Sequence, residues 1–173
     1  MHRALVELLG EDFRFNKVAD LGAGTGLCGV ALRAHAGELV AIDISANMLR
    51  GAQSKAVYDS IIIGDIVDKL NERDDVFDLF VAAGVFIYVG ALEAIFAAVR
   101  QQATDGAYFA FSIERFEGTD FILQKTGRYA HAIPYIQRLA DESGFQVALT
   151  KPVNIRKEKN GWIEGDLFVL QAR

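Results

Sequence analysis

The sequence predicts an α/β domain with a parallel sheet that helices cover on both faces. Short apolar segments of strand character alternate with segments of helical periodicity over most of the chain. One such strand, residues 60–63, reads Ser-Ile-Ile-Ile and needs burial on both faces, which is typical of parallel sheets. Near the end of the chain an Asn160-Gly161 pair separates two further apolar segments, which indicates an antiparallel hairpin.

Five strands and four helices are predicted before residue 114. The strands are residues 17–21, 39–42, 60–63, 77–82 and 107–113. The helices are residues 27–35, 45–55, 66–73 and 92–102, and Ser45 is a suitable N-cap for the second of them. This alternation of strand and helix is what a parallel sheet with covered faces requires.

The two ends of the chain differ from this pattern. Residues 1–10 mix Glu7 into an apolar helical pattern and lack the uninterrupted apolar core of a signal peptide. Residues 114–127 are polar and aperiodic, so they predict a functional loop. A helix over residues 131–143 and strands over residues 145–155 and 162–171 follow, with a turn at residues 159–161. We expect one domain over residues 1–173, with residues 1–15 as a short helical cap.

Composition excludes several classes of protein. The 173 residues are 51% hydrophobic and 24% charged, as in ordinary globular proteins. A formal charge of -5 disfavours nucleic acid as a partner, because nucleic-acid binders usually present a basic face. A single cysteine, Cys28, excludes an internal disulfide and a cysteine zinc cluster and suits a reducing cytoplasm. Neither a metal site nor a charge-free apolar run long enough for a membrane span is predicted.

A glycine-rich segment after the first strand predicts a nucleotide site. Residues 18–27 read Val-Ala-Asp-Leu-Gly-Ala-Gly-Thr-Gly-Leu, which takes a strand through three glycines into a helix. Glycines let backbone amides approach a ligand closely, and the amides that begin a helix favour negative groups. Asp20 lies near the buried end of the strand, where an unpaired carboxylate is costly, so it must bind a partner.

The ends of the next three strands add matching chemistry at the same edge of the sheet. Asp43 follows the second strand and can accept both hydroxyls of a ribose. In Gly64-Asp65-Ile66, after the third strand, the carboxylate can bond the exocyclic amine of adenine. The fourth strand ends in Ala82-Ala83-Gly84, small residues that leave room beside the glycine-rich segment. These residues together predict a site for an adenosine-containing ligand.

Residues 18–113 resemble the class I S-adenosylmethionine-dependent methyltransferases. Asp20-Leu21-Gly22-Ala23-Gly24-Thr25-Gly26 resembles their first motif, Ala41-Ile42-Asp43-Ile44-Ser45 their ribose-binding acid and Gly64-Asp65-Ile66 their adenine contact. Residues 77–83 are similar to their fourth strand. Residues 111–114 and 127–131 are similar to bacterial methyltransferase domains that often follow tetratricopeptide repeats, although no such repeat occurs in these 173 residues.

The resemblance implies a Rossmann-like three-layer sandwich whose seven-stranded sheet has the order 3-2-1-4-5-7-6, with strand 7 antiparallel. It also implies S-adenosyl-L-methionine as cofactor and S-adenosyl-L-homocysteine as product. Gly84 departs from the family, in which many members carry a polar residue there, often Asp, and this removes one candidate for substrate contact or base. The predicted cofactor-binding residues are Asp20, Gly22, Ala23, Gly24, Thr25, Gly26, Asp43, Ile44, Met48, Gly64, Asp65, Ile66, Ala82, Ala83 and Gly84.

Methyl transfer from a sulfonium is an in-line displacement at an activated carbon, so the protein must mainly align the acceptor and exclude water. A hydroxyl or protonated amine acceptor would also need a base. Glu114, Tyr129 and His131 follow the fifth strand and are the candidates. We expect a small-molecule acceptor, with a protein side chain as the alternative; no motif names it, and oligomeric state stays open.

Other functions and structural roles fit parts of the pattern. The segment from Gly24 to Gly29 matches Gly-x-Gly-x-x-Gly, and Asp43 follows at the spacing of a nicotinamide dinucleotide site. Asp20 and Asp65 favour S-adenosylmethionine over an NAD-dependent oxidoreductase. A non-catalytic module that binds S-adenosylmethionine is a further alternative, suggested by Gly84. Singly, Asp65 could be a helix cap, Met48 a core residue and Cys28 a small buried hydrophobe.

Overall fold

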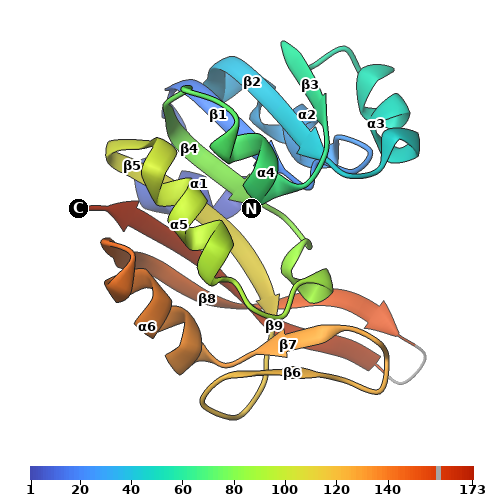
Figure 1. The fold of residues 1–173 in the computed structure, drawn as a ribbon, viewed down its shortest axis with the longest axis vertical. Helices are drawn as coiled ribbons and strands as arrows, with labels where there is room; N and C mark the ends of the chain where they lie inside the picture. The colour runs from blue at the N-terminus through green and yellow to red at the C-terminus, as the bar shows by residue number, and fades with distance from the viewer. Residues whose placement is uncertain (159–160) are drawn as a thin grey trace.

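A computed structural model describes residues 1–158 and 161–173. Seven strands form one mixed sheet with helices on both faces, which makes a three-layer α/β/α sandwich of the Rossmann-like kind (Figure 1). The strands of this sheet are β1 (Phe15–Leu21), β2 (Ala36–Asp43), β3 (Ser60–Ile63), β4 (Phe77–Ala82), β5 (Ala103–Glu114), β8 (Phe145–Glu158) and β9 (Gly161–Ala172).

The order of strands in this sheet is β3-β2-β1-β4-β5-β9-β8. Neighbours among β1 to β5 are parallel, and β9 is antiparallel to both β5 and β8. The predicted order 3-2-1-4-5-7-6 differs, because two short strands, β6 (Phe121–Leu123) and β7 (Tyr129–His131), were not predicted. These strands pair with each other as a separate antiparallel hairpin. The last two strands of the main sheet are therefore the eighth and ninth in the chain.

Helices cover the two faces of the sheet with separate apolar cores. The helices are α1 (His2–Leu9), α2 (Leu27–Leu32), α3 (Ala46–Gln53), α4 (Ile66–Asn71), α5 (Glu93–Gln102) and α6 (Ile133–Glu142), with 3₁₀ turns η1 (Arg33–His35) and η2 (Phe86–Tyr88). α4, α5 and α6 pack on one face around Phe80, Phe109 and Phe111 (Figure 1). α1 and α2 pack on the other face through Leu5 and Leu32. Within the described residues, no helix combines the length and apolar character that crossing a membrane demands.

The predicted helices of the first half exist, with shorter bounds. The helix predicted over residues 27–35 ends at Leu32 and continues as η1. The Ser45 cap of α3 is confirmed, because its hydroxyl accepts a hydrogen bond from the Met48 amide at 3.3 Å. α1 packs on the sheet, and among the described residues none of residues 1–15 lines the cavity described below.

The region after β5 is more regular than predicted. Residues 114–127 were expected to form a loop, but they contain β6, whose three residues are too few to show an alternating pattern. The helix predicted to begin at residue 131 begins at Ile133, because His131 pairs with Phe121 in the hairpin and Ala132 is extended. Pro134 lies in the first turn of α6, where its missing amide proton is harmless.

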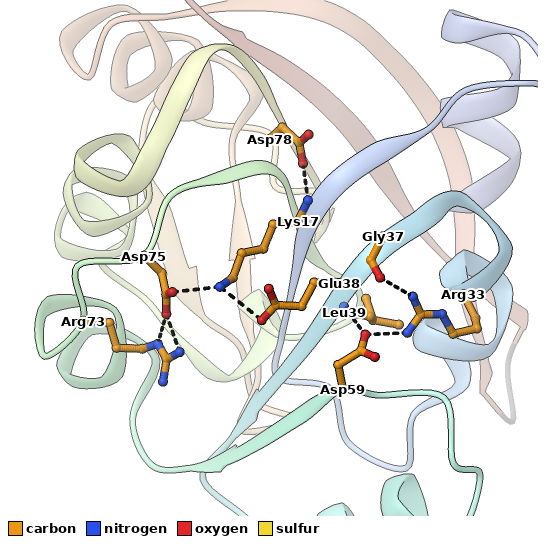
Figure 2. Close-up of polar contacts among 9 residues, drawn as sticks. All are labelled: Lys17, Arg33, Gly37, Glu38, Leu39, Asp59, Arg73, Asp75 and Asp78. Carbon is orange, nitrogen blue, oxygen red and sulfur yellow. Dashed lines mark hydrogen bonds and ion pairs between the residues drawn. The ribbon is translucent and has the colours of Figure 1, made fainter.

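Ion pairs tie the strands together at the edge where β1 and β2 begin (Figure 2). Lys17 Nζ lies 2.8 Å from Asp75 Oδ1 and 3.1 Å from Glu38 Oε1. Arg33 Nη1 lies 2.6 Å from Asp59 Oδ2. Partly exposed pairs of this kind each contribute little stability. They lie where neighbouring parallel strands begin. The carboxyl ends of these strands meet at the opposite edge of the sheet.

β8 and β9 form the antiparallel hairpin that the sequence predicts. Their pairing extends from Phe145 and Ala172 to Glu158 and Gly161. Lys159 and Asn160, the first residues of the predicted turn, lie outside the described residues. The hairpin places β9 beside β5 and so completes the sheet.

Candidate functional site

A cavity of about 800 Å³ opens where β1, β2, β3 and β4 end. A volume of this size lies in the range of cofactor and small-molecule sites. Its walls come from the glycine-rich segment and from the segments that follow the other three strands. The lining residues are Asp20, Gly22, Ala23, Gly24, Thr25, Leu27, Cys28, Asp43, Ile44, Met48, Gly64, Asp65, Ile66, Ala83, Gly84, Val85, Tyr88 and Val89.

Every residue predicted to bind the cofactor lines this cavity except Gly26 and Ala82. Gly26 is the N-cap of α2 and is buried against Ala52 and Tyr58. Ala82 is fully buried in the core between the sheet and α5, and the next residue, Ala83, reaches the cavity. Segments far apart in the sequence meet here because parallel strands end at one edge of a sheet.

Backbone hydrogen bonds to β2 hold the glycine-rich segment in place. The amides of Gly22 and Ala23 donate to the Ile42 carbonyl at 2.7 and 3.2 Å. Gly22 has a φ of +67°, and a Cβ there would lie 2.4 Å from Val85 Cγ2. Only glycine therefore fits at this position, both for its backbone conformation and for its close approach to the segment after β4.

Asp43 anchors the glycine-rich segment from β2. Its Oδ2 accepts from the Gly24 amide at 2.7 Å, and its Oδ1 accepts from the Ser45 amide at 2.7 Å. Each carboxylate oxygen accepts more than one hydrogen bond, so Asp43 can hold this loop and still accept from ligand hydroxyls. The two amides fix the orientation of the carboxylate at the cavity wall.

Asp20 is the most buried acid of the site, with 1% of its surface exposed. Its Oδ2 accepts from the Tyr58 hydroxyl at 2.6 Å. Burial, together with the charge of Asp43, raises the pKa of Asp20 to about 6, while hydrogen bonds from Tyr58 and the Gly29 backbone act in the opposite direction. The partner that a buried carboxylate requires is therefore present in the protein itself.

Asp65 has a structural role in addition to its place at the cavity. Its Oδ1 accepts from the Val67 amide at 2.8 Å and the Asp68 amide at 3.3 Å, which caps α4. Its Oδ2 makes no hydrogen bond within residues 1–158 and 161–173. The side chain can cap the helix with one oxygen and offer the other to a ligand.

The wall formed by the segment after β4 carries no charged side chain. It consists of Ala83, Gly84, Val85, Tyr88 and Val89. The backbone of Gly84 has a φ of +73°, and a Cβ there would touch nothing within 4 Å. Tyr88 is 68% exposed at the mouth of the cavity. This part of the cavity is thus open and apolar, with one phenol at its rim.

Charge is distributed unequally over the cavity. Asp20, Asp43 and Asp65 supply three carboxylates, and the part of the chain that the structure describes adds no Lys, Arg or His to the lining. Carboxylates in a partly enclosed site attract cations and repel phosphate groups. Leu27 and Ile44 at the mouth are about three-quarters exposed, at 74% and 75%, and offer apolar contact.

Known proteins identify the kind of domain that carries this cavity. A family model described as a methyltransferase domain matches residues 18–106, which is more than half of the chain. The chain belongs to this methyltransferase family. No curated protein matches it in sequence.

Solved structures share the fold of this methyltransferase domain. The N-methyltransferase NodS from Bradyrhizobium japonicum, in complex with S-adenosyl-L-homocysteine, aligns with a TM-score of 0.76 at 17% identity, over 99% of this chain and 85% of that chain. Magnesium protoporphyrin IX methyltransferase from Synechocystis, with bound S-adenosylmethionine, aligns with a TM-score of 0.73 at 18% identity, over 99% and 78%. An S-adenosylmethionine-dependent methyltransferase from Mesorhizobium loti aligns with a TM-score of 0.73 at 21% identity, over 98% and 96%.

The three predicted bases do not line the cavity of this methyltransferase domain. His131 is fully buried, its Nε2 lies 2.9 Å from the Gly90 carbonyl oxygen, and burial lowers its pKa. Tyr129 packs against Gly90, where a Cβ would lie 2.6 Å from its ring. Glu114 is 3% exposed at the end of β5. A role as base stays a prediction for all three.

Several residues of the site were not predicted. Leu27, Cys28, Val85 and Val89 line the cavity, and Tyr58 bonds Asp20 from outside it. Leu27 ends the glycine-rich segment and Cys28 follows it, so extending the motif by one helical turn would have found both. Nothing in the sequence connects Tyr58 with Asp20, because the two residues meet only when β3 is placed beside β2 and β1.

Proposed function

We propose that this chain is an S-adenosylmethionine-dependent methyltransferase (EC 2.1.1) that methylates a small-molecule acceptor by in-line transfer. The charge of the cavity carries the proposal, because three carboxylates line it without a cationic side chain among the described residues. S-adenosylmethionine carries a sulfonium and an ammonium group against one carboxylate, so its net charge is positive. A nicotinamide dinucleotide carries two phosphates instead, which the same carboxylates repel.

The glycine-rich segment supports the same choice of ligand. A dinucleotide site needs backbone amides that are free to bind the diphosphate. Here the Gly22 and Ala23 amides donate to the Ile42 carbonyl, and the Gly24 amide donates to Asp43. These amides are used inside the protein, and the carboxylate of Asp43 lies where a phosphate would be repelled.

The residues present fit the parts of S-adenosylmethionine. Asp20 would receive the ammonium group, and Asp43 would accept from the ribose hydroxyls. Asp65 would accept from the exocyclic amine of adenine, with Ile44 and Met48 in contact with the ring. The cofactor, when bound, supplies a methyl group already activated by the sulfonium. The protein needs to bind and orient the two reactants and exclude water between them.

The uncharged wall after β4 is the proposed place of the acceptor. Gly84 and Val85 leave apolar space there, and Tyr88 lies at its rim. Such a wall suits the uncharged part of a small molecule better than a charged polymer. A protein side chain is the alternative acceptor. For an alcohol or a protonated amine, the proposed bases are Glu114, Tyr129 and His131.

Calorimetry with three ligands tests the cofactor. We expect S-adenosyl-L-methionine and S-adenosyl-L-homocysteine to bind and NADH not to bind. Asp43→Asn should weaken S-adenosyl-L-homocysteine by about tenfold or more, because hydrogen bonds to a charged acceptor contribute about 1.5–3 kcal/mol. Glu38→Gln is the matched control, since Glu38 lies at the other end of β2 and forms only a partly exposed ion pair.

Release of S-adenosyl-L-homocysteine with mixtures of small-molecule alcohols, amines, thiols and carboxylic acids tests turnover. Product formation with a single acceptor class would define the substrate and exclude a non-catalytic module. Tight binding of NADH without binding of S-adenosyl-L-homocysteine would overturn the proposal. Methylation of protein extracts but of no small molecule would replace the acceptor part of it.

A further inference from the structure

Tyr58 lies outside the cavity and contacts its most buried carboxylate. The residue precedes β3, and its ring is partly buried. Its hydroxyl donates to Asp20 Oδ2 at 2.6 Å, a short distance typical of a hydroxyl that donates to a carboxylate. Asp20 lies on β1, which is two strands away from β3 in the sheet. This hydrogen bond therefore connects the segment before the edge strand with the site.

Two glycines, the α2 N-cap Gly26 and Gly29 within α2, make this contact possible. A Cβ at Gly29 would lie 2.3 Å from the Tyr58 hydroxyl oxygen, and a Cβ at Gly26 would lie 3.0 Å from ring atom Cε2. The Gly29 amide also donates a hydrogen bond to Asp20. The last glycine of the Gly-x-Gly-x-x-Gly pattern therefore has a specific purpose here: it leaves space for the phenol and supplies a second donor to the same carboxylate.

The groups that face Asp20 explain what these two donors do. Asp43 adds a negative charge from β2, which opposes ionisation of Asp20. Cys28 on α2 stays a neutral thiol, because burial and the charge of Asp20 raise its pKa. Burial and the same charge raise the pKa of Tyr58, so the phenol keeps its proton and remains a donor. Within the described residues, Tyr58 and the Gly29 amide are the groups that favour the ionised carboxylate.

We infer that Tyr58 is a positioning residue of the cofactor site. Its hydroxyl keeps Asp20 ionised and fixed at the cavity wall, where the carboxylate receives the ammonium end of the ligand. This inference rests on the proposed function for the identity of the ligand. It has a direct consequence for pH dependence. Affinity for a ligand with an ammonium group should fall when Asp20 gains a proton, and Tyr58 should set the pH at which this happens.

The first test uses the protein without any ligand. Carbon-13 NMR follows the carboxyl carbon of Asp20 as a function of pH in the wild type and in Tyr58→Phe, with Asp20→Asn used to assign the signal. Tyr58→Phe keeps the ring that packs against Gly26 and removes only the hydroxyl. We expect the midpoint to rise from about 6 by about one pH unit, because a hydrogen bond to a charged acceptor contributes a factor of about ten.

The second test measures binding of S-adenosyl-L-homocysteine by calorimetry over the same pH range. Tyr58→Phe should bind about as tightly as the wild type at high pH, about fivefold more weakly at the wild-type midpoint and up to about tenfold more weakly below it. 5′-Methylthioadenosine lacks the ammonium and carboxylate groups, so its affinity should change with neither pH nor the substitution. This ligand separates a change at Asp20 from general damage to the adenosine site.

Two further variants complete the design. Gly29→Ala should displace the phenol and raise the Asp20 midpoint in the same direction. Tyr108→Phe is the matched control, because the Tyr108 hydroxyl accepts from Gln171 Nε2 at 3.2 Å and lies outside the cavity lining. Its Asp20 midpoint should equal that of the wild type.

An Asp20 midpoint that is the same in Tyr58→Phe and the wild type would overturn the inference. So would an equal loss of affinity for S-adenosyl-L-homocysteine and 5′-methylthioadenosine at every pH, since that indicates loss of structure. Failure of the wild type to bind S-adenosyl-L-homocysteine would overturn the proposed function instead, and the ligand-free NMR midpoints would still decide the role of Tyr58.

Discussion

The buried carboxylate of Asp20 should lower the stability of the unliganded protein at neutral pH. Burial raises its pKa to about 6 from a value of 3.8 for an ordinary Asp. Because the folded pKa lies above the unfolded one, the folded protein holds the extra proton between these two values. Its contribution to stability is therefore fully present below about pH 4 and is lost as the pH rises through about 6. Asp20→Asn removes this titration.

The size of the effect follows from the two pKa values. A rise of about two pH units corresponds to ~3 kcal/mol, at about 1.4 kcal/mol for each unit. Domains of this size usually have 5–15 kcal/mol of total stability, in round terms about 10 kcal/mol, so the loss is a substantial part of it. The exposed fraction of Asp20 is 1%, so solvent screening removes little of this energy.

Urea unfolding at a series of pH values measures this prediction. The free energy of unfolding of Asp20→Asn minus that of the wild type should grow by up to ~3 kcal/mol between about pH 4 and pH 7 and then stay level. Other titrating groups, such as His131, contribute to both proteins and cancel in the difference. The hydrogen bonds of the new amide would add a constant to the difference in free energy of unfolding and would not change how that difference varies with pH.

A difference that is the same at low and neutral pH would refute this reasoning, because it would show that Asp20 is not held ionised in a buried site. Glu38→Gln is the control and should give a level difference, since Glu38 forms a partly exposed ion pair. Asp20→Asn should also bind S-adenosyl-L-homocysteine at least about tenfold more weakly. Gain of stability with loss of binding is the pattern expected of a functional buried charge.

Four further substitutions at three positions test other parts of the structure. Gly22→Ala should lower stability by about 2 kcal/mol or more in thermal unfolding and weaken S-adenosyl-L-homocysteine, because its φ is +67° and the new Cβ would lie 2.4 Å from Val85 Cγ2. Asp65→Ala should lower stability by ~1 kcal/mol through loss of the α4 cap, and Asp65→Asn should retain most of it. Burial lowers the pKa of His131, so the unfolded chain binds the proton more readily than the folded protein. The free energy of unfolding of the wild type should therefore fall as the pH drops below about 6.5. Urea unfolding of His131→Gln should lack this part of the pH dependence.

Each of these has an outcome that contradicts it. An unchanged melting temperature for Gly22→Ala would mean that the backbone relaxes away from Val85 without strain. Equal losses for the Ala and Asn variants at position 65 would show that helix capping is not the cause. An acid-side slope that persists in His131→Gln would belong to another group.

Much of the fold was predictable because its signals are local. β1, β2, β4 and β5 are buried along much of their length, and their apolar runs stand out in the sequence. The burial on both faces predicted for residues 60–63 was wrong, because β3 is the edge strand of the sheet and its residues are partly exposed. The Ser45 cap and the hairpin before Gly161 depend on a few neighbouring residues. The β6-β7 hairpin was missed because each strand has only three residues, and its position against His131 depends on contacts that no short window contains.

The candidate site was predictable where a glycine or an acidic residue follows a strand and its chemistry indicates a single role. Gly22, Asp43 and Asp65 stand at such positions, and the cavity contains all three. The predicted bases were chosen from their place after β5, and that place does not determine which way a side chain points. In the structure His131 is buried in the core, and Tyr88, from the segment after β4, lies at the cavity rim.

The sequence alone determined the alternation of strands and helices, the glycine-rich segment and the acids that belong to a methyltransferase domain. These properties depend on periodicity and on glycine or carboxylate chemistry at fixed spacing, which a linear chain displays. Only the tertiary structure decided that Tyr58 holds Asp20 and that Asp43 uses the Gly24 amide. Such contacts join segments that form or flank different strands, so their distance is set by packing of the whole sheet rather than by spacing along the chain.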